Sequence, residues 1–245
     1  MGARGYVLIT RPEPDASQFG ADLGALGYDI IVDPVMMIET LSFALPDFSE
    51  YNAVIFTSPN AVRALASQVS TIHKNVAAFC VGDQTAQEAA RFFSQAISAG
   101  GNQNDLKSLL IRQFGKDKPE LPLLYVRGED ISGDLEGDLV RAGVPCQSLV
   151  VYRARPSMRL QAATLHALAE GRVIVIPLFS ARTARIFFEL AEQVTATQAL
   201  NTIKFLCLSD SVLESVPASR RAQAYICAAP TRDAMMALIK THMPL

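Results

Sequence analysis

The stretches YVLITRPEPDASQFGADLGALGYDIIVDPVMMIE (6–39) and LPLLYVRGEDISGDLEGDLVRAGVPCQSLVVYRA (121–154) carry the same pattern, without a gap. An offset of 116 residues pairs Arg11 with Arg127. Each copy reads as a buried apolar strand, an Arg turn, an amphipathic helix closed by Gly, and a second apolar strand. A duplicated α/β chain is expected to form two lobes with a cleft, and function is to be sought in that cleft.

Composition favours an ordinary globular protein. The 245 residues can form two small domains, each with its own core, and half of them are hydrophobic while 19% are charged. The formal net charge is −2 and there is no polybasic run, so nucleic acid and anionic membranes are not expected as partners. The longest apolar run, VIVIPLF (173–179), is too short to cross a bilayer. The first strand begins at Tyr6 and leaves no room for a signal peptide, so we expect a cytoplasmic address.

The residues that usually hold metals or phosphates are scattered or missing. The four cysteines, which have no CxxC spacing and which we interpret as reduced structural thiols, are Cys80, Cys146, Cys207 and Cys227. The histidines His73, His166 and His242 stand alone, so neither a metal site nor a His-based triad is predicted. Neither GxGxxG nor GxxxxGK[ST] occurs, and no cofactor is predicted.

Between and after the two copies, apolar runs alternate with helix-length segments. A connector at about 37–50 leads to a strand at 53–56, and Ser58 and Pro59 then begin a helix to about residue 69. Further strands are expected at 76–82, 95–98, 173–179, 203–209 and 224–229, with helices near 84–94 (after Asp83), 104–114, 181–193 and after Pro230. Strands that are apolar throughout are typical of parallel sheets covered on both faces. The predicted fold is α/β, with two similar parallel-sheet lobes.

Capped helix starts follow several of the expected strands. Ligands of parallel sheets bind beyond the carboxyl ends of the strands, where unpaired helix amides attract anions. These starts are Thr57-Ser58, Gly82-Asp83, Ser180 and Ser209-Asp210. They predict anion sites around the cleft, although each residue alone could simply cap its helix.

Arg11 and Arg127 follow strands at equivalent points of the two copies. A guanidinium there could clamp carboxylates, or it could bridge to Glu13 and Glu129, the acids at matching positions. Tyr152, at the end of a strand, is the distinctive acid/base candidate, with packing as the alternative interpretation.

Taken in order, these motifs resemble those of the uroporphyrinogen-III synthase family over nearly the whole chain. The residues that carry the resemblance are LITRP (8–12), VIFTSPNAV (54–62), FCVGDQTA (79–86), LLYVRG (123–128), LVRAG (139–143) and VVYRA (150–154). The resemblance implies a substrate, hydroxymethylbilane, that is a linear tetrapyrrole with eight carboxylates. It also implies ring closure with inversion of the last pyrrole and loss of water, without metal or organic cofactor.

The resemblance further implies exchanged lobes joined by a two-stranded linker, with 1–36 plus 156–245 in the first lobe and 37–155 in the second. The repeat itself leaves open whether each copy folds alone or exchanges its leading βαβ piece. Family contacts fall on Thr57, Ser58, Gly82, Thr85, Arg127, Tyr152 and Ser180, and Tyr152 matches the tyrosine proposed to assist departure of the hydroxyl. From their places after strands, Arg11, Gly128 and Ser209 complete the predicted substrate-binding set.

The chain departs from the family pattern in its last third and at one earlier turn. It has FSARTAR (179–185) and LSDSVLESV (208–216) where the family often has a Ser-Pro turn and a Gly-rich Thr-Ala loop, and Asp134 where it often has Arg. The rival interpretations are a non-catalytic two-lobed binder of an anionic molecule and a nucleotide-sugar transferase, and the missing phosphate loop argues against the second. We expect a monomer, with transient contact with the preceding pathway enzyme as a further possibility.

Overall fold

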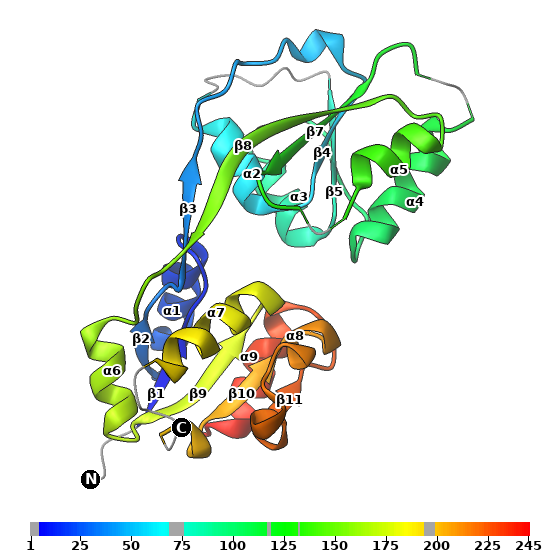
Figure 1. The fold of residues 1–245 in the computed structure, drawn as a ribbon. Helices are drawn as coiled ribbons and strands as arrows, with labels where there is room; N and C mark the ends of the chain where they lie inside the picture. The colour runs from blue at the N-terminus through cyan, green and yellow to red at the C-terminus, as the bar shows by residue number, and fades with distance from the viewer. Residues whose placement is uncertain (1–4, 69–75, 117–118, 132, 194–198) are drawn as a thin grey trace. The chain divides into compact units, whose positions relative to one another are not determined.

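The computed structural model describes residues 5–68, 76–116, 119–131, 133–193 and 199–245. The chain divides into two compact units. Unit 1 comprises residues 1–37 and 155–245, and unit 2 comprises residues 38–154. In each unit, helices cover both faces of one sheet (Figure 1), which confirms the predicted α/β class.

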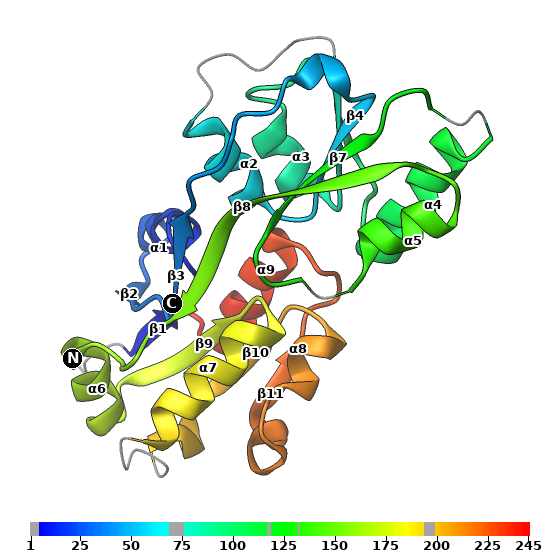
Figure 2. The ribbon, with the colours of Figure 1, turned by 45° about the horizontal axis from the view of Figure 1, so that its top comes forward.

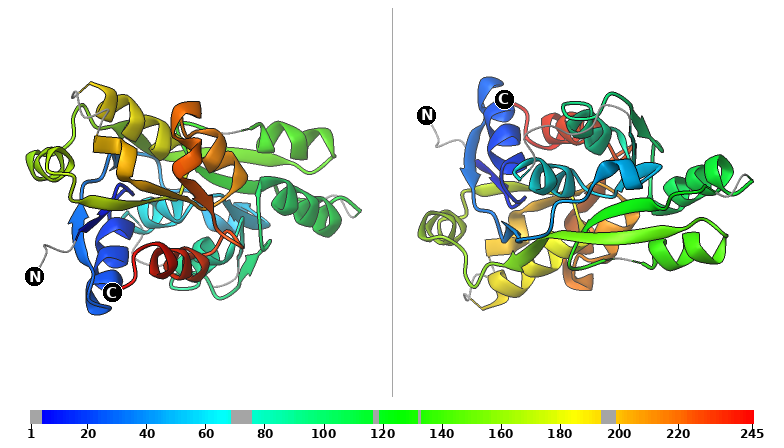
Figure 3. Two further views of the ribbon diagram at one scale, coloured as in Figure 1. Left: turned by 90° about the horizontal axis from the view of Figure 1, so that it is seen from below. Right: turned by 90° about the horizontal axis from the view of Figure 1, so that it is seen from above.

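The sheet of unit 1 is parallel in every pairing that the structure describes. Its strands are β1 (Tyr6–Ile9), β2 (Asp29–Val32), β9 (Val173–Leu178), β10 (Lys204–Cys207) and β11 (Ala224–Ile226), in the order β11-β10-β9-β1-β2. Its helices are α1 (Asp15–Ala25), α6 (Ala162–Ala169), α7 (Ala181–Glu192), α8 (Asp210–Glu214) and α9 (Arg232–His242), with short 3₁₀ turns at Ala199–Thr202 and Ala218–Gln223. Helices α1 and α9 cover one face and α6, α7 and α8 the other (Figure 3). The α1 and α9 face is closed by buried Phe19, Leu23, Met235 and Ile239.

The sheet of unit 2 has more strands than that of unit 1, and two of its strands extend into the segments that connect the units. Its strands are β3 (Met36–Thr40), β4 (Ala53–Phe56), β5 (Ala77–Cys80), β6 (Ala96–Ser98), β7 (Leu123–Gly128) and β8 (Cys146–Pro156), in the order β3-β8-β7-β4-β5-β6. Its helices are α2 (Pro59–Ala66), α3 (Asp83–Ala89), α4 (Gln103–Phe114) and α5 (Leu135–Arg141), with a 3₁₀ turn at Phe48–Glu50. The pair α2 and α3 covers one face and the pair α4 and α5 the other (Figure 2).

Alternation along the strands of unit 2 assigns each side chain to one of these faces. Val54, Phe56 and Val126 point to the core beneath α2 and α3. Ile55 and Tyr125 point to the core beneath α4 and α5. Side chains that leave the sheet just beyond these residues continue the same alternation, so the two faces also sort the functional candidates.

Each copy of the repeat pairs with strands that follow the other copy. Strand β1 of the first copy pairs with β2 and with β9, whereas β7 of the second copy pairs with β8 and with β4. This is the exchanged pairing, in which the leading βαβ piece of each copy lies in the sheet of the other half of the chain. The chain passes from unit 1 to unit 2 within β3 and returns within β8.

The strands β3 and β8 are neighbours in the sheet order. The Leu41 amide donates to the Val151 carbonyl at 2.9 Å, and the Ser157 amide donates to the Val35 carbonyl at 2.9 Å. The two partners therefore run in opposite directions, unlike the parallel pairs elsewhere in the sheet. Arg153 and Glu39 add an ion pair of 2.8 Å across the same strands.

Three local expectations need correction. The apolar segment that ends the first copy forms two strands, β2 and β3, which are separated around Pro34 and lie in different sheets. The expected connector at 37–50 therefore begins inside β3. Helix α3 is capped by Gly82 rather than by Asp83 and ends at Ala89, well before residue 94. Helix α6 was not predicted, whereas the helix start expected at Ser209-Asp210 is present as α8. Residue 69 of the helix expected from Pro59 lies outside the described part of the chain.

Candidate functional site

Seven of the ten predicted functional residues belong to unit 2 and gather where its parallel strands end. Thr57 and Ser58 follow β4, Gly82 lies two residues beyond β5, and Arg127 and Gly128 end β7. The carboxyl ends of parallel strands meet at one edge of a sheet, so these side chains share that edge. Thr85, in the first turn of α3, is 3% exposed, and Tyr152 lies opposite Gly128 on β8.

The hydroxyl of Thr57 is held from within the sheet. It lies 3.0 Å from the phenol oxygen of Tyr125, whose side chain is on the same face. Tyr125 is 4% exposed, and this burial raises the pKa of its phenol, although the bond to Thr57 and the charge of Arg127 oppose the shift. A neutral phenol thus supports Thr57 from below. Sequence reasoning missed Tyr125, because a tyrosine within the apolar run LLYVRG is indistinguishable from a packing residue.

The helix starts of unit 2 are built as capped turns. The Ser58 hydroxyl accepts a hydrogen bond from the Asn60 amide at 3.2 Å and so caps α2, with Pro59 in the first helical position. Gly82 precedes α3 in an extended conformation and supplies no side-chain cap. The first amides of these helices lie at the sheet edge, where they can donate to an anion.

A bulge brings Tyr152 onto Gly128. Arg127 pairs with Val150 but Gly128 pairs with Tyr152, so β8 carries one extra residue, Val151, at this point. A Cβ added to Gly128 would lie 2.7 Å from Cζ and 3.0 Å from the phenol oxygen of Tyr152. The ring therefore rests on bare backbone. Within the described residues, no hydrogen-bond partner reaches the Tyr152 phenol.

Arg127 lies on the opposite face from Tyr152 and is held by neutral acceptors. Its Nε donates to the Ser148 hydroxyl at 3.1 Å, and its Nη1 donates to the carbonyls of Gly128 at 2.8 Å and Glu129 at 3.3 Å. Ser148 in turn donates to the Glu136 carboxylate. Among the residues that the structure describes, Arg127 forms no ion pair, and Glu129 contributes its carbonyl rather than its carboxylate.

The three remaining predicted residues belong to unit 1. Arg11 pairs with Asp15 at 3.1 Å and stacks over the Phe179 ring, 4.0 Å from its centroid. Both charged side chains are largely buried, at 12% and 18% exposure, so the Arg11 charge is locally compensated. Glu13, which the sequence suggested as the partner of Arg11, instead accepts hydrogen bonds from the amide and the hydroxyl of Ser17.

The serines of unit 1 differ in how firmly they are held. Ser180 caps α7 by accepting from the Thr183 amide at 3.1 Å, and the two hydroxyls of these residues are also hydrogen-bonded. Ser209 lies before α8 without a side-chain cap, and its hydroxyl is 3.0 Å from that of Ser211. Both serines follow parallel strands and lie at the carboxyl edge of their sheet.

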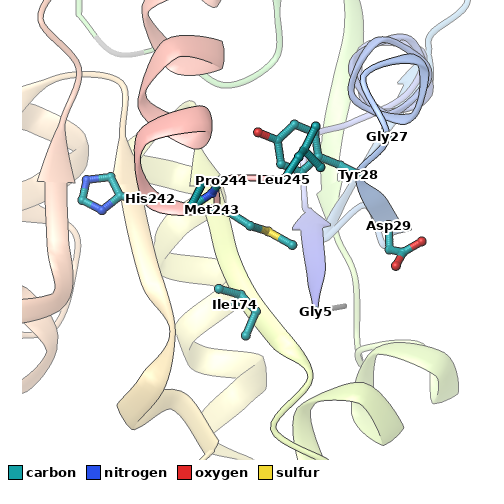
Figure 4. Close-up of a pocket in the computed structure, with 9 residues that line it drawn as sticks. All are labelled: Gly5, Gly27, Tyr28, Asp29, Ile174, His242, Met243, Pro244 and Leu245. Carbon is teal, nitrogen blue, oxygen red and sulfur yellow. The ribbon is translucent and has the colours of Figure 1, made fainter. Parts of the chain in front are cut away.

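A cavity of about 370 Å³ in unit 1 lies away from all of these residues. It is formed at the amino edge of the sheet, by the starts of β1, β2 and β9 and by the C-terminal residues after α9 (Figure 4). Ile174, Met243 and Leu245 supply its apolar wall. None of the predicted site residues lines this cavity, so it is not the candidate active site.

The remaining polar and sulfur groups form no further centre in the described part of the chain. No group of three or more His, Cys, Asp and Glu side chains there is arranged to hold a metal ion. All four cysteines are buried and free, and burial raises the pKa of Cys80, Cys146 and Cys207 to about 12. His166 lies beside Glu170 on α6, and His73 lies outside the described residues. No described helix is long and apolar enough to span a membrane.

Comparison with known proteins gives one consistent result. The family model described as Uroporphyrinogen-III synthase HemD matches residues 17–237. A curated relative from Chlorobaculum parvum, named uroporphyrinogen-III synthase, is 27% identical over 192 residues, which cover 75% of this chain and 78% of the relative.

Solved structures are similar in fold. The uroporphyrinogen-III synthetase of Helicobacter pylori aligns with a TM-score of 0.64 and 17% identity, over 98% of this chain and 99% of its own. A mutant uroporphyrinogen III synthase of Thermus thermophilus aligns with a TM-score of 0.58 and 16% identity, over 97% and 98%.

Proposed function

The chain belongs to the uroporphyrinogen-III synthase family, and we propose that its catalytic and substrate-binding groups are the residues at the carboxyl edges of its two sheets. Its function is that of a uroporphyrinogen-III synthase, a lyase of tetrapyrrole biosynthesis that acts on a small-molecule substrate. The observation that carries the proposal is the Tyr152 phenol, which rests on the backbone of Gly128 and has no hydrogen-bond partner among the described residues.

Tyr152 is the proposed catalytic residue. In the reaction that the family resemblance implies, the C–O bond to the hydroxyl of hydroxymethylbilane breaks, helped by electrons from the pyrrole nitrogen, and the oxygen leaves as water. A phenol that donates a hydrogen bond to the departing oxygen lowers the barrier of that step. Because its oxygen has no competing partner within the described residues, the Tyr152 phenol is free to make that bond.

The polyanionic substrate calls for donors rather than for further acids or bases. Arg127 has no ion pair within the described residues, so its charge is available to a carboxylate. The Thr57 and Ser58 hydroxyls, the buried Thr85 and the amides after Gly82 are proposed as further contacts of unit 2. Holding a flexible substrate in the one conformation that inverts its last ring is a matter of orientation, which such donors supply.

We extend the proposal to Arg11, Ser180 and Ser209 as contacts of unit 1 with other substrate carboxylates. Support for Arg11 is weaker than for Arg127, because Asp15 already compensates its charge. Ser180 follows a strand just as Ser58 does, and each caps the next helix. That equivalence favours a similar use of both serines.

Further parts of the proposal concern the protein as a whole. We propose two domains, 1–36 with 156–245 and 37–155; the compact units of the structure lie within one residue of these bounds, which supports the division. We also propose a monomer in the cytoplasm, with transient contact with the preceding enzyme and with no nucleic-acid or membrane partner. Four free, buried thiols are in keeping with a reducing compartment.

The test supplies freshly made hydroxymethylbilane to the purified protein and separates the porphyrin isomers. The wild-type chain should give isomer III, and Tyr152→Phe should give it more slowly, with uncatalysed isomer I accumulating in its place. A Tyr152→Phe enzyme with an unchanged rate and isomer ratio would remove Tyr152 from catalysis and leave only conformational control.

A further inference from the structure

Beneath the proposed substrate contacts, the sheet of unit 2 carries a row of polar side chains. Ser148 on β8 is the cross-strand partner of Tyr125 on β7, and both lie one pleat below Arg127 and Thr57 on the same face. Each member of the lower row bonds a member of the upper row. Tyr125 contacts Thr57, and Ser148 contacts Arg127.

We propose that Ser148, backed by Glu136, is a positioning residue that presents Arg127 to a substrate carboxylate. The inference rests on the proposed function, since it assigns a support to one of its binding residues. Neither Ser148 nor Glu136 belongs to the family motifs on which that function was argued.

The direction of the hydrogen bonds is fixed by the groups themselves. A guanidinium only donates and an ionised carboxylate only accepts. The Ser148 hydroxyl must therefore accept from Arg127 Nε and give its single hydrogen to Glu136. Bonds arranged in one direction polarise each other, so the Glu136 charge strengthens the hold of Ser148 on Arg127.

One nitrogen of the Arg127 guanidinium remains available to a ligand. A guanidinium has five N–H donors, one on Nε and two on each Nη. Ser148 takes the hydrogen of Nε, and the carbonyls of Gly128 and Glu129 take those of Nη1. No described residue bonds Nη2, so its two donors are the end that would meet a carboxylate.

Placing Glu136 behind a hydroxyl also preserves the charge of Arg127. The carboxylate is close enough to bond Ser148, yet no ion pair joins it to Arg127 within the described residues. Arg11, in contrast, is paired directly with Asp15. Support through a neutral group holds the guanidinium in place without neutralising it, which suits a residue that must attract an anion.

The experiment measures KM and kcat for isomer III formation in Ser148→Ala, Ser148→Thr and Arg127→Gln enzymes and in the double variant Ser148→Ala/Arg127→Gln. Arg127→Gln should raise KM about 30-fold, as expected for loss of a charged hydrogen-bond donor. Ser148→Ala should raise KM about fivefold with kcat within about twofold, because it loosens Arg127 without removing it. Ser148→Thr keeps the hydroxyl and should restore KM.

The double variant decides whether Ser148 acts through Arg127. If it does, Ser148→Ala should add nothing to Arg127→Gln, whereas two effects that multiply would overturn the proposal. Ser67→Ala is the control, because Ser67 is an exposed serine of unit 2 whose hydroxyl donates to a backbone carbonyl, that of Ala64, at 2.8 Å. It should lower the melting temperature slightly and leave KM unchanged.

The outcomes separate this inference from the function beneath it. A large effect of Arg127→Gln with none of Ser148→Ala refutes the positioning role and leaves the substrate contact intact. An unchanged KM in Arg127→Gln refutes the contact itself, and with it any role for Ser148. Should Ser148→Ala fail to fold, Glu136→Gln tests the same relay, with an expected rise of about twofold in KM.

Discussion

The two copies of the repeat share their scaffold but differ where the chemistry is proposed. In both, the helix ends in a glycine with positive φ, 95° at Gly27 and 81° at Gly143. The capping hydrogen bonds are the same as well. The amides of Gly27 and Gly143 donate to the carbonyls of Gly24 and Val140. In each copy the amide of the residue after the glycine donates to the carbonyl of the residue before that acceptor. This is the Schellman arrangement, repeated at an offset of 116 residues.

Beyond the glycine the copies diverge. The strand of the first copy is broken at Pro34, whereas β8 of the second copy continues for eleven residues with a bulge at Val151. At the offset of the repeat, Met36 takes the place of Tyr152, and Pro12 takes the place of Gly128. The first copy thus lacks both the phenol and the bare backbone on which the phenol rests.

The arginines diverge in the same sense, since Arg11 is paired with a carboxylate and Arg127 with neutral acceptors. Equivalent positions on a repeated scaffold can therefore serve structure in one copy and binding in the other. The sequence offset alone would have assigned them one role.

The largest expected effect that separates the copies is on catalysis. Tyr152→Phe should slow isomer III formation about 100-fold, the lower end of what general-acid assistance supplies, because the pyrrole itself drives departure of the hydroxyl. The counterpart change Met36→Leu should leave the rate unaltered. Steady-state rates on fresh substrate check both, and equal rates for Tyr152→Phe and wild type would erase the proposed difference.

The second largest effect on catalysis is expected for Gly128→Ala. Its Cβ would lie 2.7 Å from Tyr152 Cζ, so the ring must move, and we expect about a tenfold loss in kcat together with a lower melting temperature. The control is Gly24→Ala in the helix of the first copy, where a Cβ meets nothing within 4 Å and should stabilise the helix by up to about 1 kcal/mol. An active, fully stable Gly128→Ala enzyme would show that the ring has room to rearrange.

The shared scaffold makes a symmetrical prediction. Gly27→Ala and Gly143→Ala each place a side chain at positive φ, which should destabilise the unit that contains it by about 1 kcal/mol. Urea denaturation followed by hydrogen exchange within each unit measures the two costs separately. Markedly unequal costs would indicate that one copy relies on its cap far more than the other.

A comparable loss of stability, with only a slight effect on binding, is expected at the equivalent helix starts. Ser58→Ala should cost about 1 kcal/mol of stability through the lost cap and should weaken substrate binding slightly. Ser180→Ala should cost a similar amount. Replacement by Asp retains the cap but repels a carboxylate, so a raised KM in a stable Ser58→Asp enzyme would separate binding from capping.

The sequence predicted the elements that depend on local pattern and missed those that depend on distant contacts. Apolar runs and caps such as Ser58 and Ser180 were visible because each is encoded within a few residues. The break before β3 was not, since it is fixed partly by the buried Asp33, whose carboxylate accepts from the Gln161 amide at 2.8 Å, far along the chain.

The candidate site shows the same limit. Its strand-end residues could be listed from the sequence, but the hydroxyl of Ser148 and the phenol of Tyr125 are hidden inside apolar runs. Their roles depend on which residue lies opposite on the next strand. The bulge at Val151, which brings Tyr152 opposite Gly128, is likewise not predicted by anything in VVYRA.

The exchanged pairing also bears on how the chain is made. Strand β1 finds its neighbour β9 only after more than 160 further residues have been synthesised, which takes on the order of ten seconds or more. Unit 2 is continuous in sequence and can complete its sheet while that synthesis proceeds. We therefore expect a nascent chain, arrested when its first 165 residues have left the ribosomal exit tunnel, to protect unit 2 from protease while its first 37 residues are still cleaved. The N-terminal strand must then be kept from aggregating until its partner leaves the ribosome.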